Sequence, residues 1–259
     1  MTTSHNAADM HALGFSYDRW QDAVEAAIAT DKLSVIGEVR GGQHIQYLDP
    51  SGAQLNILAV EPFATFIGFE SISSCFAHVS MLNDVLGLLE IVTPAGEKIM
   101  EVTANLAQGP LLAEAEPQQW QQVGFTAMGI AVTSFNSAEN YVASENAVGT
   151  EFPALISAGA DIIRSGSGTE VPDAGVLFAA TVIESEWREN HLTGEKFIHA
   201  VLDGVFPIDL CLPECFGELP TKGTVLAGTA VLTSRILTPL SSCGTSGGCG
   251  CGSGGCGGH

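Results

Sequence analysis

Three stretches of the chain repeat one pattern, and this pattern limits most of the sequence to a β-rich fold. In residues 44–60, 88–104 and 186–202, a β-like run meets a short polar turn and a second β-like run follows. Each turn contains a glycine, at Gly52, Gly96 and Gly194. Glycine adopts the positive φ angle that tight hairpin turns require. The pattern therefore predicts three β-hairpins. Their similarity is too short to establish an internal duplication, because recurring hairpin turns would produce the same pattern.

Two segments have the periodicity of helices instead. In residues 16–31, apolar side chains recur at helical spacing on one face, and Asp18 with Gln21 three residues later forms a candidate capping box. The residues of this apolar face are Trp20, Ala23, Val24, Ala27 and Ile28. A second helix is predicted over residues 138–148, with Ser137 as its cap.

The region before the tail is the most strand-rich. Four apolar runs, 176–187, 196–203, 206–213 and 224–237, follow one another without an intervening helical segment. Such spacing is typical of a small barrel or sandwich, and we expect an OB-like antiparallel β-barrel. Residues 157–175 are rich in Gly, Ser and Asp, which is typical of a linker. The predicted fold class is α+β and β-rich, with an N-terminal α+β domain (1–170), a barrel-like domain (171–240) and a disordered tail (241–259).

The order of three motifs resembles an uncharacterised actinobacterial protein family of unknown function. These are the early helix with Tyr17 and Trp20, the segment DPSGAQL at 49–55, and ESEWRENHLTGEKF at 184–197. The resemblance covers most of the chain before the tail, and its motifs consist of turn and strand residues. The resemblance therefore implies an actinobacterial origin for this protein. Because the family has no known function, it assigns neither an activity nor site residues to this chain.

The charge of the chain excludes several kinds of partner. Nine Lys and Arg residues stand against 29 Asp and Glu, for a formal net charge of −20. A chain this acidic, without a basic cluster, repels phosphate backbones and anionic lipids, so we expect no nucleic-acid or membrane binding. The N-terminal residues have no secretory pattern, and no apolar run is long enough to span a bilayer. We therefore expect a cytoplasmic protein.

The last 19 residues, SSCGTSGGCGCGSGGCGGH, contain nine glycines, four of the seven cysteines and a terminal histidine. Thiolate and imidazole groups bind soft metals, and glycine lets a chain fold around an ion. The candidate metal ligands are Cys243, Cys249, Cys251, Cys256 and His259. Their spacing differs from the paired Cys-x2-Cys of structural zinc sites, which favours an exchangeable site. Candidate cofactors are zinc, copper, nickel or an iron–sulfur cluster.

The tail alone resembles three kinds of Cys- and Gly-rich segment. Its Cys-Gly-Cys-Gly element is similar to the terminal motif of A-type iron–sulfur carriers, and its ending resembles the metal-binding tail of nickel-handling prolyl isomerases. Its composition also resembles precursor peptides whose cysteines are cyclised to thiazoles. That third resemblance implies a recognition role for the rest of the chain. The alternative without a function is a solvated low-complexity extension whose cysteines bind nothing.

Candidate chemistry elsewhere is sparse. Cys211 and Cys215 could form a ligand pair if His191 or His199 lay nearby, although a buried Cys211 and a loop Cys215 are the simpler expectation. Cys75 and His78 are close in sequence, but we expect a buried cysteine beside a surface histidine. Several carboxylates surround the C-terminal strands, and we expect most of them to form a solvated face. They are Glu184, Glu186, Glu189, Asp203 and Asp209.

These features favour a non-enzymatic binding protein with a protein partner and a tail that binds or delivers a soft metal ion. Two alternatives stay open. One is an enzyme with a site outside the tail, which would require a pocket joining Cys75 or Cys211 to a histidine and a carboxylate. The other is an interaction module, or a precursor whose tail cysteines are modified.

Overall fold

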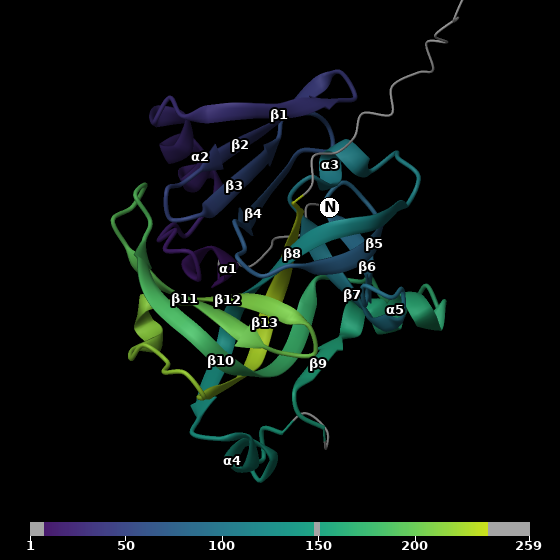
Figure 1. Ribbon diagram of the computed structural model, residues 1–259. Helices are drawn as coiled ribbons and strands as arrows, with labels where there is room; N and C mark the ends of the chain where they lie inside the picture. Colours follow the sequence, from purple (N-terminus) through teal and green to yellow (C-terminus); the bar gives the residue numbers. More distant parts are fainter. Residues whose placement is uncertain (1–7, 148–150, 238–259) are drawn as a thin grey trace, which may run out of the picture.

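The computed structural model describes residues 8–147 and 151–237 of the protein. Two short helices, α1 (Ala8–His11) and α2 (Trp20–Ala29), precede four antiparallel strands. The strands β1 (Leu33–Val39), β2 (Gly42–Leu48), β3 (Ala53–Leu58) and β4 (Ala64–Phe69) form one sheet in chain order. Figure 1 shows this sheet above the larger sheet, with α2 at its side.

The remaining strands form a nine-stranded mixed sheet. They are β5 (Cys75–Met81), β6 (Leu86–Val92), β7 (Lys98–Leu106), β8 (Gln118–Phe135), β9 (Ala154–Ser157), β10 (Gly175–Glu189), β11 (Lys196–Asp203), β12 (Pro207–Pro213) and β13 (Val225–Ile236). The helical elements between them are α3 (Gly109–Leu112), α4 (Ala138–Val142), α5 (Ala158–Ser165) and the 3-10 helix η1 (Glu214–Phe216). Strands hold 50% and helices 15% of the described residues, which confirms a β-rich fold.

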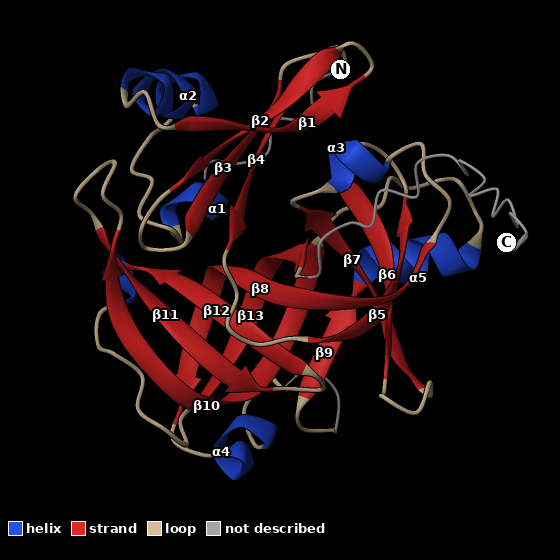
Figure 2. Ribbon diagram, turned by 45° about the horizontal axis from the view of Figure 1, so that its top comes forward, coloured by secondary structure: helices blue, strands red, loops and turns tan. Residues whose placement is uncertain are grey.

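The strand pairings of the larger sheet close into two rings that share β8 and β13. One ring runs β8–β5–β6–β7–β13, and the other runs β8–β12–β11–β10–β13. Each ring has a single parallel pair, β7–β13 in the first and β12–β8 in the second. Figure 2 shows β8 crossing from the β11–β12 side of the molecule to the β5–β6 side.

Two large apolar clusters hold the fold together. The first lies inside the rings and joins both of them, with Leu89, Phe125, Phe178 and Leu232 among its fully buried side chains. The second lies between the four-stranded sheet, α1, α2 and the outer side of β11, β12 and β8. Alternation along most of the strands sends every second side chain to one of these clusters, which is why these runs have the sequence pattern of strands.

All three predicted hairpins are confirmed. They are β2–β3, β6–β7 and β10–β11, and the glycine at each turn has a positive φ: 93° at Gly52, 87° at Gly96 and 77° at Gly194. The four C-terminal strand predictions coincide with β10 to β13. Residue 170 lies between α5 and β10, and strands on both sides of it share the nine-stranded sheet.

The helix predictions are right in position and partly wrong in detail. Within α2, Ala23 and Ala27 are buried as expected, whereas Ile28 is 56% exposed. The predicted capping box is wrong, because the N-cap is Arg19 and no side chain caps the helix. Helix α4 ends at Val142 and not near residue 148, but its cap is confirmed, since the Ser137 hydroxyl accepts a hydrogen bond from the Asn140 amide.

Candidate functional site

The predicted tail ligands Cys243, Cys249, Cys251, Cys256 and His259 lie outside the described residues. The structure does describe the point from which the tail departs, at the end of β13. There Arg235 bonds to Glu70 (Nη1 to Oε1, 2.8 Å), and the Leu237 amide donates to the Gln122 carbonyl (2.8 Å). The Gln108 side chain makes two hydrogen bonds to the main chain of Ile236. Its Oε1 accepts from the Ile236 amide at 3.0 Å, and its Nε2 donates to the Ile236 carbonyl at 3.1 Å. These contacts fix residues 235–237, the last described part of the chain, beside the end of β4.

The Cys211 and Cys215 pair behaves as two separate residues. Cys211 lies opposite His199 in the β11–β12 register, is fully buried, and belongs to the second apolar cluster. Burial, followed by the charge of Asp209, raises the pKa of Cys211 well above its ordinary value. Cys215 lies in η1 and is exposed. The expectation of a core cysteine and a surface cysteine is thus confirmed.

Cys75 and His78 do not form a nucleophile–base pair. An odd separation along β5 sends the two side chains to opposite faces of the strand. Cys75 packs against the ring interior, where burial raises its pKa to about 12. His78 accepts a hydrogen bond from the Trp120 amide at Nδ1 (3.1 Å), and its ring lies edge-on to the Trp120 ring.

The carboxylates of the C-terminal strands are mostly solvated, as expected, with one exception. Glu184, Glu186, Glu189 and Asp203 are exposed, whereas Asp209 is completely buried. Asp209 accepts hydrogen bonds from the amides of Ile72 (2.7 Å) and Ser73 (3.0 Å) and from the Ser73 hydroxyl. Its carboxylate therefore joins β12 to the segment that connects the two sheets.

His199 extends this buried polar network. Its Nε2 lies 2.8 Å from Asp209 Oδ2, and its Nδ1 lies 3.6 Å from Glu186 Oε1. The Phe69 ring from β4 covers the imidazole, with ring centroids 5.0 Å apart. In a Ser-His-Asp triad the imidazole stands between hydroxyl and carboxylate, but here Ser73 bonds to the carboxylate itself. The arrangement holds the sheets together and does not activate a nucleophile.

A second buried carboxylate, Asp49, organises the hairpin between β2 and β3. It accepts hydrogen bonds from the Tyr47 hydroxyl (3.0 Å), the Ser51 amide (2.9 Å) and the His191 amide (3.0 Å). Burial acts to raise the pKa of Asp49, but these hydrogen bonds outweigh it and the pKa falls below its ordinary value. Burial and the Asp49 carboxylate raise the pKa of Tyr47 to about 12. This network fixes the turn against the β10–β11 connection.

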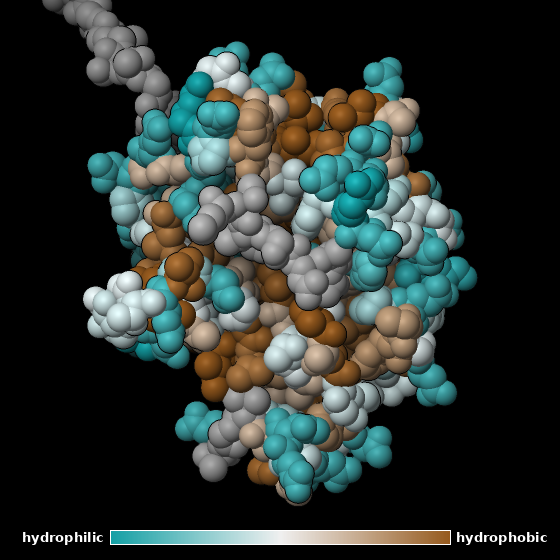
Figure 3. All heavy atoms as spheres, turned by 180° about the vertical axis from the view of Figure 1, so that it is seen from behind, coloured by the Kyte–Doolittle hydropathy of each residue, from teal (hydrophilic) through white to brown (hydrophobic). Residues whose placement is uncertain are grey.

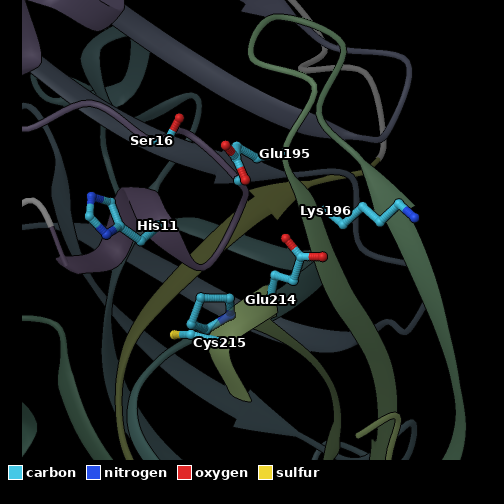
Figure 4. A pocket seen from close by; sticks show the side chains of 8 residues that line it. His11, Ser16, Glu195, Lys196, Glu214 and Cys215 are labelled. Carbon is cyan, nitrogen blue, oxygen red and sulfur yellow. The ribbon is translucent and has the colours of Figure 1, made fainter. Parts of the chain in front are cut away.

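A surface pocket of about 350 Å³ lies between α1, the start of β11 and η1. It is lined by His11, Gly14, Ser16, Glu195, Lys196, Pro213, Glu214 and Cys215. Figure 4 shows the Lys196 side chain extending away from the other labelled side chains. Within the described residues no hydrogen bond or ion pair joins these side chains, so Cys215 has no base positioned to activate it.

The sequence analysis named Asp209 and His199 separately but did not join them in one network, and it did not select the buried polar residues of the four-stranded sheet, His44, Gln54 and Asn56. In the described ranges, 8–147 and 151–237, no group of three or more His, Cys, Asp and Glu side chains could hold a metal ion. None of the helices in these ranges has the length and apolar character needed to cross a bilayer. No protein-family model, curated protein or solved structure matches the chain.

Proposed function

We propose that the protein is a non-enzymatic, cytoplasmic binding protein whose tail takes up a soft metal ion. The observation that carries the proposal is the concentration of four thiols and one imidazole within residues 243–259. The ligands are Cys243, Cys249, Cys251, Cys256 and His259. Two of the three thiols outside the tail are unsuited to this role, because burial raises the pKa of Cys75 and Cys211.

The tail would bind its metal through thiolates, and four sulfurs with one imidazole exceed a tetrahedral shell by one ligand. Because the five tail ligands include one more than the ion needs and are irregularly spaced, we expect the bound metal ion to exchange. Zinc, copper, nickel or an iron–sulfur cluster would suit these donors. Because thiols lose protons when they bind a metal, uptake releases protons and weakens in acid.

Elemental analysis of the full chain, purified without added metal, tests the proposal. We expect bound metal in the natural protein and its loss when the four tail cysteines are changed together to serine. Cys215→Ser is the matched control, because Cys215 is an exposed thiol outside the tail and should leave the metal content unchanged. Equal metal content in the natural chain and the fourfold variant would overturn the proposal.

The proposed protein partner has a surface that suits it. Strand β1 is an edge of the four-stranded sheet and carries Val35 (55% exposed) and Ile36 (38% exposed). Figure 3 shows hydrophobic residues gathered at the top of the back face, where the four-stranded sheet lies. An exposed apolar edge strand can pair with a strand of another chain. Pull-down of a stable complex that Val35→Lys abolishes is the expected result.

We also propose that the second ring is the OB-like barrel expected from the sequence. The closed circuit of pairings β8–β12–β11–β10–β13 supports this, since four of its five strands are the four predicted runs. The net charge of −20 argues against a single-stranded nucleic acid on its surface. Titration with oligonucleotides at low salt should therefore show no binding.

A further inference from the structure

The first ring carries a tryptophan in a backbone conformation that bulky residues rarely adopt. Trp120 lies in β8 and has a φ angle of 55°, in the left-handed region. The pairing of β5 with β8 shifts between Ala77 and Val79. Gln119 and Trp120 therefore both stand opposite a single residue of β5, His78. This arrangement is a β-bulge, which turns a side chain away from the direction that regular alternation would give it.

Three aromatic side chains gather at this bulge: Phe76, His78 and Trp120, which we call the aromatic platform. The alternate residues of β5 pack inside the ring, so Phe76 and His78 lie on its outer side. The Trp120 ring centroid is 5.2 Å from that of His78 and 6.4 Å from that of Phe76, and both contacts are edge-on. Trp120 is 51% exposed and Phe76 is 38% exposed, so the platform faces solvent.

Packing within the fold does not account for a tryptophan at this position. A left-handed backbone is unfavourable for a residue with a Cβ atom, and glycine would adopt it without that cost. The exposed half of the Trp120 ring contributes nothing to the burial of apolar surface that stabilises the fold. The His78 Nδ1 atom nevertheless holds the bulge in place by accepting the Trp120 amide at 3.1 Å. Strained residues that the surrounding structure holds in place cluster at functional sites, which indicates that the platform is a binding surface.

The turn between β6 and β7 brings a carboxylate to the platform. A Cβ atom on Gly96 would lie 3.2 Å from the Trp120 ring, so this turn is in contact with the tryptophan. Glu97 is the next residue along the chain, and it is exposed. Among the residues that the structure describes, no Lys, Arg or His forms an ion pair with Glu97. Its negative charge is therefore available to a ligand that contacts the tryptophan.

The cations on this side of the ring are already engaged with carboxylates. Lys98 Nζ lies 3.1 Å from Glu90 Oε2 and 2.8 Å from Glu101 Oε1, and Arg164 Nη2 lies 3.5 Å from Glu101 Oε2. The chain as a whole has a formal net charge of −20. A surface of this sign repels anions and attracts cations. The face of an aromatic ring also attracts cations, and tryptophan does so most strongly.

We propose that the aromatic platform binds an arginine-bearing segment of a protein partner, with a guanidinium group on the Trp120 ring and Glu97 as its counter-charge. Arginine suits this surface better than lysine, because its planar guanidinium stacks on an aromatic face and is more weakly hydrated than an ammonium group. The platform lies on β5 and β8, not on the β1 edge, and binding there needs no metal in the tail. The inference therefore goes beyond the function proposed above.

Fluorescence anisotropy tests this proposal with the full chain and a short labelled peptide of alternating glycine and arginine, in about 0.15 M salt with a chelator. We expect saturable binding that Trp120→Leu weakens about fivefold or more, because leucine keeps an apolar surface but has no ring to attract a cation. Trp187→Leu is the matched control, since Trp187 is a 40% exposed tryptophan on β10, and it should leave the affinity unchanged. Glu97→Gln should weaken binding about twofold.

A second variant and a second peptide keep the outcome decisive. Trp120→Gly suits the left-handed backbone, so it should fold and lose the same affinity if Trp120→Leu fails to fold. A peptide with neutral citrulline in place of arginine should bind about fivefold or more weakly than the arginine peptide. Equal affinities for Trp120→Leu and Trp187→Leu would overturn the proposal, because net charge alone would then attract the peptide. Undiminished binding of the citrulline peptide, or no saturable binding by the natural chain, would also overturn it.

Discussion

Removal of the Asp209 carboxylate should strongly destabilise the protein. Asp209→Ala leaves the Ser73 amide, the Ser73 hydroxyl and the His199 ring buried without their acceptor. The Ile72 amide is only partly buried and can turn to water. A buried group that loses its partner costs about 1–3 kcal/mol, and three such groups lose theirs here. We therefore expect the free energy of unfolding to fall by about 4 kcal/mol.

Urea unfolding followed by tryptophan fluorescence measures this loss as a shift of the transition midpoint. Asp209→Asn should lose about 2 kcal/mol, because the amide oxygen still accepts while the NH2 group faces a donor. Asp203→Ala is the control, since this exposed carboxylate ends the neighbouring strand and its removal should change stability by about 0.5 kcal/mol or less. A loss below about 1 kcal/mol for Asp209→Ala would refute the role of this network in joining the two sheets.

Three other outcomes are expected. Iodoacetamide at pH 8 should modify the exposed Cys215 long before Cys75, because a pKa of about 12 keeps the Cys75 thiol protonated. Peptide mapping measures the two modification rates, and equal rates would contradict this expectation. Gly228→Ala should lower stability by about 3 kcal/mol, because its Cβ would lie 1.9 Å from the Ala131 oxygen. Gly223→Ala, with open space around it, should lose about 1 kcal/mol, and thermal unfolding should separate the two. Stability should fall as the pH drops below the ordinary His44 pKa of 6.5, since burial lowers the folded-state pKa and only the unfolded chain then gains the proton. His44→Gln should flatten that part of the pH profile, and an unchanged slope would count against the assignment.

Local structure was largely predictable because local physics determines it. The hairpins follow from the positive φ values at Gly52, Gly96 and Gly194, and the Ser137 cap follows from a hydroxyl placed before a helix. The capping box failed because the helix starts at Trp20, where neither Asp18 nor Gln21 is placed to cap it. The exact start of a helix depends on the backbone conformation of one or two residues, which the composition of the segment does not specify.

Long-range pairing was beyond the sequence pattern. Thr233 of β13 pairs with Asn105 of β7, and Asp209 of β12 pairs with Thr126 of β8, although each pair is far apart in the chain. Alternation predicts that a strand has two faces but does not identify its neighbours. No local sequence pattern therefore indicates that β8 and β13 belong to both rings.

The buried polar residues were missed for a different reason. Cys211 was expected in the core, and period-two alternation places Asp209 on the same face, so the burial of Asp209 could have been inferred. The burial of His44 and Asn56 could not be inferred in this way, because polar residues at every second position of a strand usually indicate a solvated face. Their burial depends on what packs over the sheet, which is a tertiary property.

The shared pair of strands also constrains how the protein is made. β13 follows every strand that it closes in both rings, so neither circuit can be completed until that strand has been synthesised. Ribosomes add about 5–20 residues per second, which leaves β5, β6 and β7 with exposed apolar faces for several seconds. Closure then requires contacts between residues far apart in sequence, which are slow to form. Both rings therefore stay open until β13 is available, and in the meantime chaperones that shield hydrophobic strands could bind the apolar faces of β5, β6 and β7.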